Sequence, residues 1–421
     1  MSIEFLPIPL PPSADASKLS EFGREVRGFD PGKDWTEDEF REIEEGLYKY
    51  DLLLFRDCEF PPEKQLVLTQ AFDPTQVSYG HDHDSASAAR SIILHPGVKH
   101  IPHVPQVQLI GNGHIPPEHT YGLSDGGEEV RISHPTHTTF HRTRIAEDEL
   151  WGGDGGDDES GDKRKRATRF MRWHIDAALY DLSPPKVTTL YGVVVPGCES
   201  PGTILQTCRY DDGTPDTLDV STASTVFISG KNMFEGLERE WRSVAVRGRV
   251  RYAPYPYVWM STARAHETGL GIVCEGREVP LEELPEWKEE RVKVLPFLWK
   301  NPITGELAMQ VHPCAALELI IDPLPADAPR DGALYPDGAH IKDLKAVRDL
   351  LYKMQRPAIA PNLIYPHDWR PKDLVLFHNR GVMHSVTGSL RPDELRVFHQ
   401  CNLAASEDPE GPSADDVRRW A

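Results

Sequence analysis

Residues 172–176 read Arg-Trp-His-Ile-Asp, and this stretch decides the fold and the chemistry that we expect for the chain. On a β-strand the side chains at positions i and i+2 point to the same face. A strand here would therefore let His174 and Asp176 hold one metal ion together. The triplet is the only His-x-Asp or His-x-Glu in a chain with 18 histidines. Because a histidine-rich chain of this length can contain such a triplet by chance, further features have to support it.

A third ligand and a cation follow far along the chain. His384 comes just after an apolar segment, residues 374–377, that reads as a strand. Two histidines and one carboxylate on one face of a metal leave coordination positions open, as iron(II) oxygenases require. Arg396 comes shortly after His384, on the next expected strand, where it could bind the far carboxylate of a dicarboxylate co-substrate in a bidentate pair. The combination predicts a non-haem iron oxygenase.

The last expected strand, residues 395–403, places several polar side chains on one face. Arg396, Phe398, Gln400 and Asn402 share parity and should point the same way. Buried polar groups need partners, so we interpret this face as the wall of a polar pocket. Gln400 and Asn402 would then bind a substrate with several hydrogen-bonding edges. The alternative is a solvent-facing edge strand.

Local patterns indicate a β-rich core with flanking helices. Residues 35–50 form an expected helix with a capping box at Thr36 and Glu39, followed by a buried strand at 51–57. A second good helix spans 343–354, with Asp343 as the expected N-cap. A shorter helix is expected at 231–240. Further strands are expected at residues 187–195, 207–210, 218–220, 225–228 and 373–377.

The chain is expected to form one domain of 421 residues. Residues 1–16 read as an extended tail, and residues 80–145, where Pro and Gly interrupt every periodic run, as a loop-rich lid region. Residues 152–166 change from acidic glycine repeats to four basic residues, which predicts a flexible loop or, as the weaker alternative, a nuclear localisation patch. Residues 169–405 should contain the core with its insertions.

The formal net charge of −20 makes nucleic acid and anionic membrane poor partners and favours a small-molecule substrate. The six cysteines are scattered without a CxxC pair, which is typical of reduced thiols in a cytoplasmic protein. We expect neither a signal peptide nor a membrane span. A homo-oligomer is compatible with the sequence.

Several segments resemble the taurine dioxygenase family of iron(II)/2-oxoglutarate oxygenases. They are residues 23–28 and 54–57 near the start, residues 225–230 (Thr-Val-Phe-Ile-Ser-Gly), and residues 369–380 before the distal histidine. Within the family, the resemblance is greatest to the fungal xanthine dioxygenases, over residues 172–180, 209–213, 311–314 and 398–406. Two features depart from that pattern: His378 replaces the usual Asp before Asn-Arg, and the acidic-basic loop is unusually long.

The resemblance implies a double-stranded β-helix (jelly-roll) core with helical and loop insertions. It implies Fe(II) held by His174, Asp176 and His384, with 2-oxoglutarate and O2 as co-substrates. It also implies hydroxylation of xanthine at C8 to give urate, with Gln400 and Asn402 on the purine side. A threonine usually assists the arginine at the co-substrate carboxylate. Thr207 fits by distance along the chain and Thr225 by local pattern, and we favour Thr207 as the second 2-oxoglutarate-binding residue. Arg142 is a further candidate for anionic groups in the pocket.

Three alternatives remain at this point. The first is an oxygenase of the same family that acts on a sulfonate, an alkyl sulfate or a secondary metabolite. The second is a zinc enzyme that uses some of the lid-region histidines: His81, His83, His134, His137 and His141. The third is a non-catalytic jelly-roll binding protein.

Overall fold

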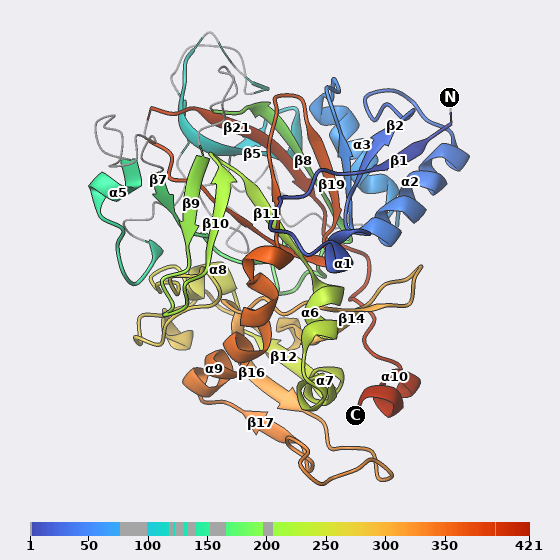
Figure 1. Ribbon diagram of the computed structural model, residues 1–421, viewed down its shortest axis with the longest axis vertical. Coiled ribbons are helices and arrows are strands. Elements are labelled where there is room, and N and C mark those ends of the chain that lie inside the picture. Colours follow the sequence, from blue (N-terminus) through green and yellow to red (C-terminus); the bar gives the residue numbers. More distant parts are fainter. Residues whose placement is uncertain are drawn as a thin grey trace.

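The computed structural model describes residues 2–75, 99–117, 119, 121–122, 130–132, 140–151, 166–196, 205–391 and 393–421. The expected acidic-basic loop lies almost entirely outside these residues, as does much of the expected lid region. The described chain is a mixed α/β structure with many strands (Figure 1).

The largest sheet, here called the main sheet, runs in the order β1-β2-β3-β19-β8-β21-β5-β4, with β6 paired to β5. Its strands are β1 (Glu4–Pro7), β2 (Arg24–Arg27), β3 (Leu52–Phe55), β19 (Leu374–His378), β8 (Val187–Val194), β21 (Arg396–Asn402), β5 (Val104–Ile115), β4 (Lys99–Ile101) and β6 (Val130–Ile132). Early and late segments of the chain thus become neighbours. Part of the expected extended tail, residues 4–7, is a strand of this sheet.

Strand β21 lies between β8 and β5 and pairs with both in antiparallel register. The alternative of a solvent-facing edge strand is therefore wrong. The approach of β5 to β21 requires a glycine: at Gly111, which has φ +155°, an added Cβ would lie 1.8 Å from the backbone oxygen of Arg396.

A smaller sheet faces the inner side of the main sheet and carries the distal histidine. It has the order β18-β11-β20, with β18 (Tyr365–His367), β11 (Thr225–Ser229) and β20 (Val382–Val386). One apolar cluster fills the space between the two sheets. It includes Phe227 and Tyr365 from the smaller sheet and Phe377 and Phe398 from the main sheet. Burial of these large aromatic side chains holds the two sheets together.

Helices α2 (Glu37–Tyr50) and α3 (Pro62–Ala71) cover the outer face of the main sheet (Figure 1). Ile43 and Leu47 of α2 and Leu68 of α3 are fully buried in one cluster with strand residues such as Leu376. The predicted capping box is confirmed, since Thr36 and Glu39 exchange both hydrogen bonds. The amphipathic pattern seen in the sequence is thus the pattern that buries this helix.

The other half of the molecule contains most of the remaining helices and a separate sheet (Figure 1). The expected single helix at 231–240 is wrong: the chain forms α6 (Gly230–Gly236) and α7 (Arg239–Arg247), because Leu237 is extended with ψ 145°. The predicted late helix is confirmed as α9 (Leu344–Gln355), capped by Asp343. The sheet in this half consists of β13 (Val294–Pro296), β12 (Gly248–Tyr252), β16 (Ala316–Ile321) and β17 (Ala339–Ile341).

The smaller elements complete the structure. The predicted hairpin is confirmed as β9 (Leu205–Arg209) and β10 (Thr217–Ser221), and β7 (Arg166–Thr168) extends it. The remaining elements are β14 (Leu298–Lys300), β15 (Leu307–Met309), α1 (Ala16–Leu19), α5 (Glu147–Trp151), α8 (Pro256–Trp259) and α10 (Ala414–Trp420). Among the described residues, none of the helices has the length and apolar character needed to cross a membrane.

Candidate metal centre

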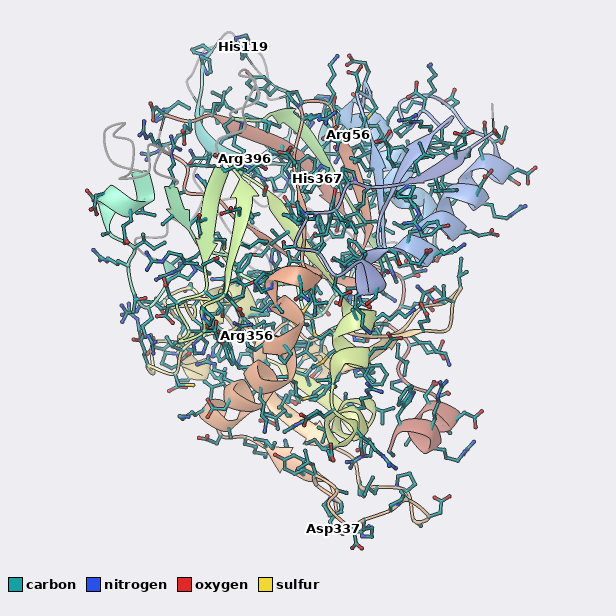
Figure 2. All side chains as sticks on the ribbon, viewed as in Figure 1. Arg56, His119, Asp337, Arg356, His367 and Arg396 are labelled. Carbon is teal, nitrogen blue, oxygen red and sulfur yellow. The ribbon has the colours of Figure 1, made fainter. Side chains whose placement is uncertain are left out.

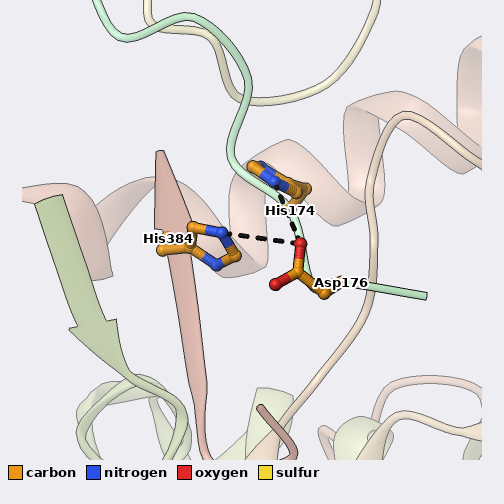
Figure 3. A group of neighbouring side chains, drawn as sticks. All are labelled: His174, Asp176 and His384. Carbon is orange, nitrogen blue, oxygen red and sulfur yellow. Dashed lines mark ion pairs between the residues drawn. The ribbon is translucent and has the colours of Figure 1, made fainter. Parts of the chain in front are cut away.

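The predicted metal ligands come together between the two sheets (Figure 3). Nε2 of His174 and Nε2 of His384 each lie 3.7 Å from Oδ1 of Asp176. Within the described part of the chain, these three residues form the one group of His, Cys, Asp or Glu side chains close enough to share a metal ion. The arrangement suits a single ion that keeps positions open for other ligands.

The backbone explains how residues so far apart in sequence meet. His174 and His384 form an isolated antiparallel bridge, in which each amide donates to the other's carbonyl at 3.0 Å. The expectation that residues 173–176 form a strand is wrong, since only His174 makes a bridge. Pairing with β20 therefore aligns the two imidazoles, and the turn after His174 brings Asp176 to them.

The carboxylate of Asp176 is held by one oxygen only. Oδ2 accepts hydrogen bonds from Thr188 Oγ1 at 2.8 Å and from Gln400 Nε2 at 3.0 Å. The other oxygen, Oδ1, faces the two histidines. Partners of this kind orient a ligand before the metal binds. The carboxylate is thus prepared to offer a single oxygen to the ion.

A buried asparagine fixes the backbone of the same residue. Asn379 accepts from the Asp176 amide at 2.9 Å and donates to the Asp176 carbonyl at 2.8 Å and to the Pro185 carbonyl at 3.0 Å. Asn379 itself is fully buried just after β19. Both the main chain and the side chain of Asp176 are therefore constrained.

Both imidazoles are in a form that can bind a metal. The contact between His174 Nδ1 and the Arg172 carbonyl, 2.7 Å long, places the proton on Nδ1 and leaves the lone pair on Nε2. Burial lowers the pKa of His174, and burial together with the neighbouring His174 lowers the pKa of His384 to about 3. The neutral form of each ring, which is the one that coordinates metals, is thus favoured.

Arg396 is a buried cation without a counter-ion. It is 1 % exposed, and none of its three guanidinium nitrogens has a hydrogen-bond partner among the described residues. It lies over the Phe398 ring, 3.9 Å from the centroid, within the strands of the β-rich half (Figure 2). Burial lowers the pKa of Arg396 to about 9. An unpaired buried charge is costly, so this site calls for an anion, as the sequence predicted.

Among the described residues, neither of the two candidate threonines forms a hydrogen bond with Arg396. Thr207 lies on β9 and donates to Asp219 at 2.9 Å. Thr225 is fully buried on β11 and accepts from the Trp369 indole at 3.0 Å. The choice of a threonine that assists the arginine stays a prediction.

The predicted substrate residues are placed differently from one another. Gln400 bonds to Asp176, so its amide supports a metal ligand. Asn402 lies two positions further along β21 and is partly exposed. The Arg142 guanidinium forms a two-pronged ion pair with Glu267 and is half exposed. That arrangement does not favour a role for Arg142 in binding an anionic substrate.

Two further features of the sequence now have structural contexts. His378, which replaces the usual Asp of the family, is buried with Nδ1 3.4 Å from Oδ1 of Asp51.

Of the lid-region histidines considered for zinc, His141 alone is described, and its Nε2 lies 2.8 Å from the Phe170 carbonyl. The other four, His81, His83, His134 and His137, lie outside the described residues.

Sequence reasoning did not assign Thr188 or Asn379. Thr188 lies on β8, and only the pairing of this strand with β21 and β19 shows that it faces Asp176. Asn379 did carry a signal, since it is a polar residue directly after the apolar strand that leads to His384. A residue in that place has to bond to backbone groups, but the sequence does not say which ones.

The fold and the site define a class: an enzyme with a β-sheet core whose His-Asp-His cluster can bind one metal. A buried arginine without a counter-ion lies on the strand that also carries Gln400, the hydrogen-bond partner of Asp176. The comparisons agree, because the family model for taurine catabolism dioxygenases (TauD, TfdA family) matches residues 9–402. The chain belongs to this family of 2-oxoglutarate-dependent dioxygenases, which use Fe(II), 2-oxoglutarate and O2. The unpaired Arg396 and the neutral histidines fit that cofactor set.

Two curated relatives are similar to nearly the whole chain. An alpha-ketoglutarate-dependent xanthine dioxygenase of Neurospora crassa is 44% identical over 409 residues, covering 96% of this chain and 87% of the relative. A protein of the same description from Schizosaccharomyces pombe is 45% identical over 412 residues, covering 98% and 90%. A crystal structure described as a taurine dioxygenase from Burkholderia xenovorans has a TM-score of 0.52 at 15% identity, covering 98% of this chain and 92% of the other. This last likeness concerns the fold.

Proposed function

We propose that this protein hydroxylates xanthine at C8 and releases urate. Xanthine, 2-oxoglutarate and O2 would give urate, succinate and CO2, with one oxygen atom of O2 in urate and the other in succinate. The buried, unpaired Arg396 is the observation that supports this reaction class: it lies on the same strand as Gln400, which bonds to Asp176, and it could bind the carboxylate of a co-substrate. Similarity to xanthine dioxygenases over nearly the full chain supports the choice of substrate.

In this proposal His174, Asp176 and His384 hold Fe(II), and Arg396 binds the far carboxylate of 2-oxoglutarate. When bound, the iron and its co-substrate supply the oxidising power for the C–H bond. The protein's part is to keep the imidazoles neutral, to offer one carboxylate oxygen, and to hold the purine with C8 toward the open face of the centre. Gln400 and Asn402 are the residues we assign to the purine side, and Gln400 also donates a hydrogen bond to Asp176.

We also propose that the main sheet and the smaller sheet together form a double-stranded β-helix (jelly-roll) core. Strands β19, β8, β21 and β5 would form one wall, and β18, β11 and β20 the other. The shared aromatic cluster between the walls and the placement of the ligands between them support this interpretation.

Turnover by the Fe(II)-loaded protein tests the proposal. Xanthine should stimulate succinate formation and yield urate in equal amount, whereas taurine and an alkyl sulfate should stimulate neither. The Asp176→Ala variant is the control for the metal centre and should give no urate. Succinate formation that responds to a sulfonate or sulfate but not to xanthine would contradict the proposed substrate and favour the alternative within the same family.

A further inference from the structure

Arg172, two residues before the metal ligand His174, has a positively charged side chain without an anionic partner among the described residues. Its carbonyl bonds to His174, and its guanidinium carbon lies 4.7 Å from the centroid of the Phe140 ring. The side chain is partly buried, and its Nε is shielded from solvent without a hydrogen-bond partner. Within the described part of the chain, this guanidinium forms neither an ion pair nor a hydrogen bond. A half-buried cation of this kind is suited to a ligand that supplies the missing acceptor.

The neighbouring arginines show that this is a specific property of Arg172. Arg169, three residues earlier, donates to the carboxylate of Asp211 and to the Thr143 carbonyl. Arg142, the arginine that the sequence suggested for substrate, is held by Glu267. Both of these guanidinium groups have protein acceptors, so of these three arginines it is Arg172 whose guanidinium is available for a ligand.

A second polar side chain without hydrogen-bond partners among the described residues lies next to the metal ligand His174. His312 is fully buried, neither of its ring nitrogens has a hydrogen-bond partner among the described residues, and its ring centroid is 6.3 Å from that of His174. Arg172 and His312 are thus both neighbours of the ligand His174, whereas Gln400 bonds to a different ligand, Asp176.

We propose that Arg172 determines substrate specificity by donating hydrogen bonds to an oxo group of the purine, with His312 as a second polar contact. The proposal rests on xanthine being the substrate. C8 belongs to the five-membered ring and must face the metal, so both carbonyl oxygens of xanthine lie on the outer six-membered ring. Arginine is well suited to these oxygens, because its guanidinium has several N–H donors in one plane. Bidentate hydrogen bonds from arginine to a purine oxygen and ring nitrogen are the commonest specific contact in DNA recognition. Because the protein has a formal net charge of −20, a local cation is all the more necessary next to the carbonyl oxygens of xanthine.

Direct binding to the Mn(II)-loaded protein tests this assignment without turnover. The Arg172→Met variant keeps an aliphatic stem over Phe140 and removes the charge, and Arg172→Lys keeps the charge but not the fork. Calorimetry would give the dissociation constants of Mn(II), of 2-oxoglutarate and of xanthine for each protein. Arg264→Gln is the matched control, because Arg264 is an arginine of this region that is already paired with Glu275.

For Arg172→Met we expect xanthine to bind at least about tenfold more weakly, the loss typical of a charge-assisted hydrogen bond. Binding of Mn(II) and 2-oxoglutarate should stay within about twofold, and Arg172→Lys should lie between the two. Unchanged xanthine affinity, or an equal loss for all three ligands, would overturn the assignment while leaving the proposed function in place. If the unaltered protein binds no xanthine, the proposed substrate and this role of Arg172 both fail.

Discussion

The side-chain amide of Gln400 donates a 3.0 Å hydrogen bond to Oδ2 of Asp176, the oxygen that faces away from the two histidines. This contact joins the strand that carries Arg396 to the metal centre. It means that a residue expected from the sequence to bind substrate also holds a metal ligand in place.

Replacing Gln400 by Met should therefore weaken metal binding. Loss of a hydrogen bond to a metal ligand commonly lowers affinity by about 10- to 100-fold, and we expect about tenfold here because Thr188 still holds the same oxygen. Electron paramagnetic resonance of Mn(II) gives the affinity directly. The control is Asn402→Leu, on the same face of β21, which should weaken xanthine binding and leave Mn(II) affinity unchanged. Equal Mn(II) affinity of Gln400→Met and the unaltered protein would contradict the positioning role.

Asn379→Ala should lower both stability and metal affinity. The substitution removes three buried hydrogen bonds to backbone groups, which corresponds to a loss of about 3 kcal/mol or more in the free energy of unfolding. Urea denaturation and Mn(II) titration measure the two effects.

Asn301→Ala provides the comparison, because Asn301 is also buried and bonded to backbone groups, at Tyr48, Ile303 and Thr304, away from the centre. It should reduce stability without reducing metal affinity. If both variants lowered metal affinity alike, the hydrogen bonds between Asn379 and the Asp176 backbone would have no specific role in metal binding.

Arg396→Met should weaken the binding of 2-oxoglutarate without lowering the stability of the ligand-free protein. In the ligand-free protein the unpaired guanidinium is costly, so its removal should leave the melting temperature unchanged or higher. A saturating concentration of 2-oxoglutarate, about 100 times its Kd, should stabilise the unaltered protein by about 2.7 kcal/mol and the variant by far less.

Arg247→Met is the matched control, because Arg247 is equally buried but donates to the carbonyls of Ser243 and Leu334. It should destabilise the protein and preserve the response to 2-oxoglutarate. A full response in Arg396→Met would show that the co-substrate binds elsewhere.

Metal affinity of the folded protein should depend little on pH between 7.5 and 5.5. Burial lowers the pKa of both ligand histidines, that of His384 to about 3, so His384 stays neutral in this range and His174 takes up a proton at a lower pH than an ordinary histidine does. Two ordinary histidines with a pKa near 6.5 would cost about a hundredfold in affinity at pH 5.5. Mn(II) affinities at the two pH values should instead differ by much less than this hundredfold factor. A fall near a hundredfold would contradict the neutral, preorganised pair.

The lowered pKa values of the two ligand histidines should also make the stability of the metal-free protein depend on pH. In the unfolded chain these histidines bind protons below about pH 6.5, whereas in the folded protein they do so only at lower pH. The metal-free protein should therefore lose stability as the pH falls from about 6.5 toward 3. Urea denaturation at several pH values measures this slope.

The sequence predicted the parts of this site that depend on residue type and parity. His174, Asp176, His384 and Arg396 could be found because metal ligands and a buried cation are rare choices in a core. The common face of Arg396, Phe398 and Gln400 followed from the two-residue period of a strand and agrees with their contacts.

The remaining features depend on contacts between distant segments. Thr188 reaches Asp176 because β8 pairs with β21, and no local pattern specifies that neighbour. The single bridge at His174 and the break between α6 and α7 are set by tertiary packing that overrides local propensity. Arg142 and Arg172 are both basic residues before the metal ligands, and only the position of Glu267 shows which of them is already paired.

The most direct test of the account is to follow the oxygen atoms. The Fe(II)-loaded protein would be supplied with xanthine, 2-oxoglutarate and ¹⁸O2 in unlabelled water, and the products analysed by mass spectrometry. We predict one labelled oxygen in urate, at C8, and one in succinate, in equal amounts. Urate that carries oxygen from water, or succinate formed without urate, would contradict the assignment of this site as a 2-oxoglutarate-dependent xanthine dioxygenase.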